Sequence, residues 1–150
     1  MPPEYKARIE AGRPVLEKSA REQYGLELNV GPSGINSRPA LIAAKFAESQ
    51  GLGNAFHKAV MHAYWQQAQS IDDPQVLKEI AQEVGLDTEH FDAALANAEY
   101  DAQVSADVEM AREYGISAVP ALVFVDKYLV VGAQPYEVLQ QVVEKVLEEG

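Results

Sequence analysis

The stretch Gly115-Ile-Ser-Ala-Val-Pro-Ala-Leu-Val-Phe-Val125 decides the fold of this chain, because it ends a helix, turns, and begins an apolar strand. A proline at the start of an otherwise buried-looking strand is unusual, since proline has no N–H to donate to a neighbouring strand. An X-Pro bond is also the only peptide bond that becomes cis at small energetic cost. The pair Val119-Pro120 therefore predicts a rigid corner with a functional role.

The residues after this corner predict a β-hairpin and a closing helix. Two continuous apolar runs rich in β-branched residues, 121–125 and 128–131, are typical of strands. Asp126-Lys127 between them is short enough for a hairpin turn. Pro135 then begins a helix with an apolar stripe.

The residues before the corner predict a series of helices, because apolar side chains recur there at helical spacing. Asp73-Pro74 is the clearest start signal, with aspartate as N-cap and proline in the first turn. The expected helices cover residues 4–24, 38–50, 54–69, 74–84, a short stretch after 87, and 99–114.

The composition excludes several classes of function. The 150 residues are 47% hydrophobic and carry a net charge of −11, with acidic residues spread along the chain, which argues against a nucleic-acid partner. No apolar run is long enough for a membrane span, and residues 1–10 lack a signal-peptide core. The chain has no cysteine, so it has no disulfide, thiolate nucleophile or cysteine-bound metal. We expect a cytoplasmic location and neither cofactor nor metal.

Several local sequences resemble the FrnE-like branch of the DsbA-like thioredoxin-fold family. They lie in residues 47–52, 63–65 and 71–77, and most strongly in residues 114–124 and 127–138. The resemblance covers essentially the whole chain. It implies a mostly helical α/β fold, with a helical insertion over residues 1–97 and the C-terminal β-β-α half of a thioredoxin-like fold over residues 98–150, so that the sheet is incomplete.

The same resemblance implies a thiol–disulfide oxidoreductase or isomerase whose thiols lie elsewhere. In the family, a Cys-x-x-Cys pair at a helix N-terminus belongs to a first βαβ unit that this sequence lacks. Met1-Pro-Pro-Glu4 is similar to a run that follows the second strand in relatives. We therefore expect the chain to be the C-terminal part of a longer reading frame and to be redox-inactive by itself. An in-frame stop directly upstream of Met1, with no Cys-x-x-Cys encoded nearby, would contradict this expectation.

The resemblance assigns a family role only to Val119 and Pro120, which would bind an extended peptide or protein thiol substrate at the proline corner. We expect no catalytic residue in this chain. Two alternatives stay open. Glutathione-dependent isomerases and kappa-type transferases resemble the same scaffold, although Gly132-Ala-Gln-Pro135 departs from their Gly-Asn-Asp-Arg-like run. A non-catalytic peptide- or protein-binding module is the other.

The remaining polar candidates have simpler interpretations. His57 and His62 lie five residues apart, about 140° around a helix, and should not face one ligand. We interpret His90 as solvated or satisfied by a partner, and Ser117 as a turn hydroxyl. Tyr64 and Trp65 could line a groove, but a helix face as apolar as theirs more often lies in the core, and we expect them there.

The incomplete sheet has a consequence for assembly. In a thioredoxin fold, the strand over residues 121–125 pairs with the first strand of the family, which is missing here. An apolar, unpaired edge promotes association, so we expect a homodimer or higher oligomer.

Overall fold

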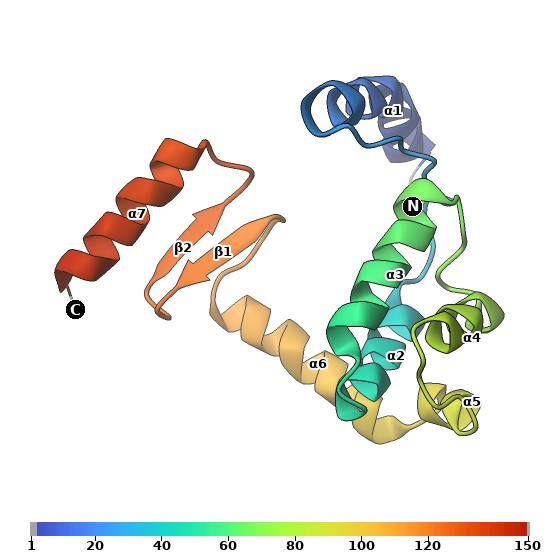
Figure 1. The fold of residues 1–150 in the computed structure, drawn as a ribbon. Helices are drawn as coiled ribbons and strands as arrows, with labels where there is room; N and C mark the ends of the chain where they lie inside the picture. Colours follow the sequence, from blue (N-terminus) through green and yellow to red (C-terminus); the bar gives the residue numbers. More distant parts are fainter. Residues whose placement is uncertain (1–2, 150) are drawn as a thin grey trace. The chain divides into compact units, whose positions relative to one another are not determined.

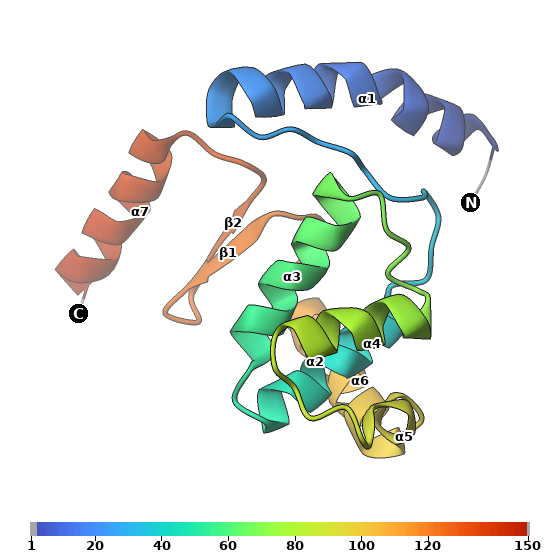
Figure 2. The same cartoon turned by 45° about the vertical axis from the view of Figure 1, so that its right-hand side comes forward.

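The computed structural model describes residues 3–149, without the side chains of residues 3, 5 and 6. It confirms a mostly helical α/β chain with a small sheet (Figures 1 and 2). The elements are α1 (Pro3–Tyr24), α2 (Arg38–Ser49), α3 (Gly53–Gln66), α4 (Pro74–Glu83), α5 (Phe91–Leu95), α6 (Ala98–Glu113), β1 (Ala121–Phe124), β2 (Tyr128–Val131) and α7 (Tyr136–Glu149). Within the described residues, no helix combines the length and apolar content that a membrane span needs.

The chain forms two compact units, and the boundary between them lies inside α6. Unit 1 is Met1–Val104 and unit 2 is Ser105–Gly150. The division expected from the sequence, between residues 97 and 98, stays a prediction about domains.

Unit 1 has a hydrophobic core built from helices α2 to α5 and the first part of α6. Phe56, Leu77 and Phe91 are fully buried. The ring of Phe46 packs edge-on against Phe91 and against Tyr100, with centroids 5.9 and 6.0 Å apart. Such aromatic pairs add about 0.5–1.5 kcal/mol beyond the burial of their area. These contacts hold the start of α6 on the helices before it.

The ends of the core helices follow the sequence signals. The Asp73 carboxylate accepts a hydrogen bond of 2.8 Å from the Gln75 N–H and so caps α4. Gly85 follows that helix with a positive φ of 83°, a conformation that glycine adopts without steric cost. Local capping therefore fixes the length of α4.

The apolar face of α1 is not buried, although its spacing resembles that of a core helix. Ile9, Val15 and Leu16 are all exposed, and among the described side chains of this helix only Ala20 is buried. Amphipathic spacing shows where an apolar face lies but not whether the chain covers that face.

Unit 2 contains the antiparallel hairpin of β1 and β2, with Ala121 opposite Val131 and Phe124 opposite Tyr128. The connection is one residue longer than the expected Asp126-Lys127, because Phe124 pairs with Tyr128 and residues 125–127 form the turn. Val125 and Asp126 have φ values of 48° and 56°, and the Lys127 N–H donates to the Phe124 carbonyl at 3.0 Å. Positive φ at both central residues is the type I′ geometry, whose twist matches the twist of the flanking strands.

Unit 2 has no buried residue among those that the structure describes. Val108 of α6, at a position where helical spacing predicts an apolar seam, is 40% exposed. The stripe on α7 is likewise open, and Leu147 is 74% exposed. The apolar stripes of α6 and α7 in this unit therefore contribute no buried side chain among the described residues.

Candidate functional site

The Val119-Pro120 corner lies between the end of α6 and the start of β1. Gly115 ends the helix with a positive φ of 69°, and the Ile116 N–H donates back to the Ala111 carbonyl at 2.9 Å. This six-residue closure is the Schellman motif, which gives the chain a defined exit from the helix. The Val119–Pro120 peptide bond is cis. The Pro120 carbonyl accepts from the Gly132 N–H at 2.7 Å, so the corner is tied to the end of β2.

Val119 is the most accessible part of this corner. Its side chain is 87% exposed. Within the part of the chain that the structure describes, neither its N–H nor its carbonyl has a hydrogen-bond partner. An exposed backbone N–H and carbonyl without partners can form hydrogen bonds with an extended peptide.

A tyrosine directly after α6 binds the tip of the hairpin, which lies at the opposite end of the strands from the corner. The Tyr114 hydroxyl donates to the Asp126 carboxylate at 2.8 Å. The pKa of Tyr114 is raised, first by this hydrogen bond and then by the negative charge of Asp126. A protonated Tyr114 therefore links the end of the helix to the hairpin turn within unit 2.

The corner contains no nucleophile with a base beside it. The chain has no cysteine. Ser117 is exposed and forms no hydrogen bond with any described residue, so no general base activates its hydroxyl. What the corner can do chemically is bind, by pairing its backbone and by contact with Val119.

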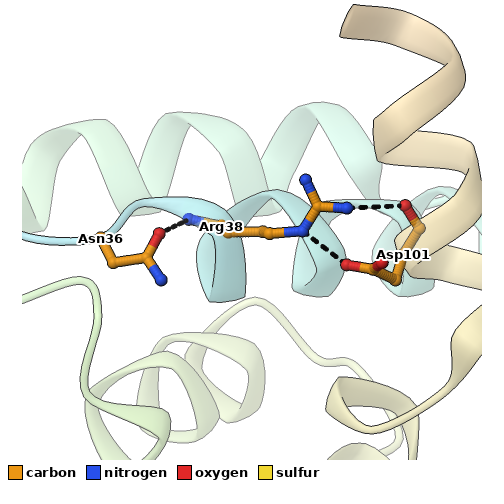
Figure 3. A network of polar contacts seen from close by, with 3 residues as sticks. All are labelled: Asn36, Arg38 and Asp101. Carbon is orange, nitrogen blue, oxygen red and sulfur yellow. Dashed lines mark hydrogen bonds and ion pairs between the residues drawn. The ribbon is translucent and has the colours of Figure 1, made fainter.

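Unit 1 contains a polar link that sequence reasoning missed. Figure 3 shows the Arg38 side chain reaching from α2 to Asp101 on α6. Its Nε donates to the Asp101 carboxylate at 2.5 Å, and its Nη2 donates to the Asp101 carbonyl at 3.1 Å. The Asn36 side chain accepts from the Arg38 N–H at 3.1 Å. The hydrogen bond to Arg38 lowers the pKa of Asp101 and raises that of Arg38. The two residues lie 63 positions apart, so no local pattern could have indicated the pair.

The histidines are placed partly as expected. His57 and His62 project from different sides of α3, yet both border one shallow hollow with Met61 and Trp65. Trp65 was expected in the core but is 38% exposed. His57 and His62 thus share a surface although their spacing argued against a common ligand.

His90 belongs to an exposed acidic turn. One potential ligand atom each from Asp87, Glu89 and His90 lie within 4.8 Å of one another. The Asp87 carboxylate accepts from the Glu89 N–H at 3.0 Å, which is a turn-capping bond. Exposed groups of this kind commonly occur without an ion, and nothing else at this turn points to one.

Comparisons with known proteins agree with the fold. A family model described as the DSBA-like thioredoxin domain matches residues 5–144. The Bacillus subtilis protein YwbO is 30% identical over 127 residues, which are 81% of this chain and 62% of that protein.

Two solved structures share the fold. A probable DsbA oxidoreductase from Streptomyces coelicolor superposes with a TM-score of 0.80 at 28% identity, covering 96% of this chain and 62% of that one. A 2-hydroxychromene-2-carboxylate isomerase gives a TM-score of 0.79 over 97% of this chain and 70% of its own, at 19% identity, which shows the fold alone.

The chain spans about 62% of the length of YwbO and of the Streptomyces protein. The family model, in contrast, matches nearly all of the chain, including the proline corner and the hairpin. The chain therefore belongs to the family of DsbA-like thioredoxin domains.

Proposed function

We propose that this chain supplies the peptide-facing part of a thiol–disulfide oxidoreductase or isomerase of the FrnE-like branch, and that it performs no redox step by itself. The observation that carries the proposal is a DsbA-like domain with an accessible proline corner and no cysteine. Thiol–disulfide exchange requires a thiolate that attacks a disulfide sulfur. Without that group, only recognition of the substrate backbone is left to this chain.

Recognition would use the backbone of Val119. Its N–H and carbonyl are free of partners within the described residues, and its side chain projects into solvent. An extended peptide can form main-chain hydrogen bonds with such a segment, and these bonds give affinity with little dependence on sequence. The proposed substrate is therefore an unfolded or extended polypeptide.

An insulin-reduction assay with dithiothreitol tests the absence of a redox step. We expect the same rate of insulin B-chain precipitation with and without the chain. A rate that increases with chain concentration would refute the proposal. Binding of glutathione in calorimetry would instead favour the isomerase or transferase alternative.

Binding of a labelled peptide tests the corner itself. The probe is fluorescein-labelled, alkylated insulin B chain, followed by anisotropy. Val119→Pro removes the N–H donor, and we expect it to weaken binding about three- to tenfold, the effect of one hydrogen bond. Ser117→Ala, a change of another exposed residue in the same segment, should bind like the parent. Equal affinities for all three chains would exclude Val119 as the binding site.

We also propose that a second copy of the chain pairs along the outer edge of β1. Within the described residues, β1 pairs with β2 only, and the sequence Ala121-Leu-Val-Phe124 carries no charge that would oppose antiparallel self-pairing. Light scattering should show a dimer or larger species, and Val123→Lys should shift it toward the monomer. A monodisperse monomer at high concentration would contradict this proposal.

A further inference from the structure

A cavity in unit 1 has no role in the proposed peptide-binding function. It is lined by residues of α1, of the loop that leads from α1 to α2, and of the end of α3, and these three segments can be followed in Figure 2. Its volume is about 280 Å³, near the lower limit of the roughly 300–1,000 Å³ typical of small-molecule sites. Its lining is largely apolar and consists of Ile9, Gly12, Arg13, Leu16, Val30, Gly31, Ser33, Gly34, Tyr64 and Trp65.

The loop wall of this cavity is fixed by backbone hydrogen bonds to α3. The Asn29 N–H donates to the Trp65 carbonyl at 2.9 Å, and the Gly31 N–H donates to the Tyr64 carbonyl at 2.7 Å. A side chain at position 31 could not fit, because its Cβ would lie 2.5 Å from the Gln69 carbonyl oxygen and 2.6 Å from the Tyr64 ring. The loop therefore lies directly against the helix, and the wall that it forms is preorganised.

One cation lies at the edge of the cavity. The Arg13 Nη2 donates to the Val30 carbonyl at 3.1 Å, which uses one of the five N–H donors of the guanidinium group. Among the residues that the structure describes, no carboxylate lines this cavity. In a chain with a net charge of −11, a cation beside an apolar cavity that no described carboxylate lines is unusual, and it favours an anionic ligand. Glu10 lines the adjoining outer hollow, where its charge would oppose a second negative group on the ligand.

The opposite wall contains a glycine that packing does not require. Gly12 lies in the middle of α1, where glycine destabilises a helix by about 1 kcal/mol relative to alanine. A Cβ at this position would meet no atom within 4 Å. The missing side chain therefore leaves space on the cavity wall and relieves no clash.

We propose that this cavity binds a small amphipathic monocarboxylate. The apolar body of the ligand, of the size of one aromatic ring, would lie against Tyr64 and Trp65, and its carboxylate would pair with Arg13. The edge-to-face pair of Tyr64 and Trp65, with centroids 5.2 Å apart, presents an aromatic wall to the ligand. Arginine and carboxylate form charge-assisted hydrogen bonds, the stronger kind of polar contact in proteins.

Trp65 makes the proposal directly testable, because it is the only tryptophan of the chain and lines the cavity. The probe is 4-phenylbutyrate, titrated at neutral pH while Trp65 fluorescence is recorded, with calorimetry as a second readout. We expect a saturable change in fluorescence. The uncharged analogue 4-phenylbutanamide should bind about tenfold or more weakly, since it lacks the charge that pairs with Arg13. This comparison needs no variant.

Two variants with matched controls locate the site. Gly12→Leu should abolish binding by filling the cavity, whereas Val15→Leu, at an exposed position of the same helix outside the lining, should not. Arg13→Gln should weaken 4-phenylbutyrate binding about tenfold, whereas Arg8→Gln should leave it unchanged. Absence of saturable binding, equal affinity for acid and amide, or full binding by Gly12→Leu would each overturn the proposal. Because none of these results depends on peptide binding at Val119, the two proposals fail separately.

Discussion

Units 1 and 2 contain equally regular helices but differ completely in what those helices bury. In unit 1, Leu77 and Phe91 are fully enclosed by neighbouring helices. In unit 2, α7 carries an apolar stripe that is just as regular, yet no described residue from 105 to 149 is buried. The difference teaches that amphipathic spacing predicts a helix and its apolar face. The same spacing does not predict which surface, if any, covers that face. The helices α2 to α5 of unit 1 cover one another's apolar faces, whereas the described part of unit 2 leaves its stripes without buried side chains.

The same substitution in the two units should have very different effects. Leu77→Ala leaves a cavity in the core, and we expect it to lower the free energy of unfolding by about 2–5 kcal/mol. Leu147→Ala removes an exposed side chain, and the expected change is within about 0.5 kcal/mol. Urea denaturation followed by Trp65 fluorescence and by circular dichroism measures both. A comparable loss in the two variants would show that Leu147 is buried in solution and would remove the contrast between the units.

Loss of a single helix cap in unit 1 should give a smaller effect. Asp73→Ala removes the acceptor for the Gln75 N–H, and we expect a loss of about 1 kcal/mol in the free energy of unfolding. Asp73→Asn keeps an oxygen at the same place and should be nearly neutral. The measurement is again the urea midpoint from Trp65 fluorescence. If Asp73→Asn were as damaging as Asp73→Ala, the cap would not be the cause.

The smallest of these effects should depend on pH. Because Arg38 lowers the pKa of Asp101 in the folded chain, the pair stabilises the fold above the pKa of unfolded aspartate, about 3.9, and this contribution is lost as pH falls through the lower folded value. Asp101→Asn should therefore be less stable than the parent at pH 7, and the difference between their urea midpoints should shrink at acid pH. Both side chains are nearly half exposed, which keeps the effect modest.

A control for this pH dependence is Glu99→Gln, which removes another carboxylate from the first turn of α6. Its difference from the parent should not follow the pattern of Asp101→Asn. A gap between Asp101→Asn and the parent that persists unchanged at low pH would show that the ion pair is not what holds the start of α6 to unit 1.

The sequence predicted the elements well because their ends are set locally. Asp73 caps α4, Gly115 closes α6, and the hairpin forms between the two predicted strands. The turn was predicted one residue too short, since nothing in the sequence favours a positive φ at Val125. Burial was predicted less well for α1, α6 and α7, because it depends on which distant surface meets each stripe.

The candidate site was predictable only in part. Val119 and Pro120 were identified by family resemblance, and their role as a binding site stays a proposal. The pair of Arg38 and Asp101 depends on a contact between distant segments, which no local spacing encodes. A groove lined by Tyr64 and Trp65 was considered and ranked below a core position, because the loop that closes the cavity lies far from α3 in sequence.

The turn at Val125 has a consequence for how the hairpin keeps its shape. Positive φ is unfavourable for a β-branched residue such as Val125, so Val125 and Asp126 do not specify the turn by themselves. The neighbouring residues are held from both sides: Tyr114 at the end of α6 binds Asp126, and Glu149 at the end of α7 accepts hydrogen bonds from Lys127 and Tyr128. The geometry of this loop therefore depends on residues before and after it in the sequence. A hairpin transferred to another protein without those two helix ends would not keep this geometry.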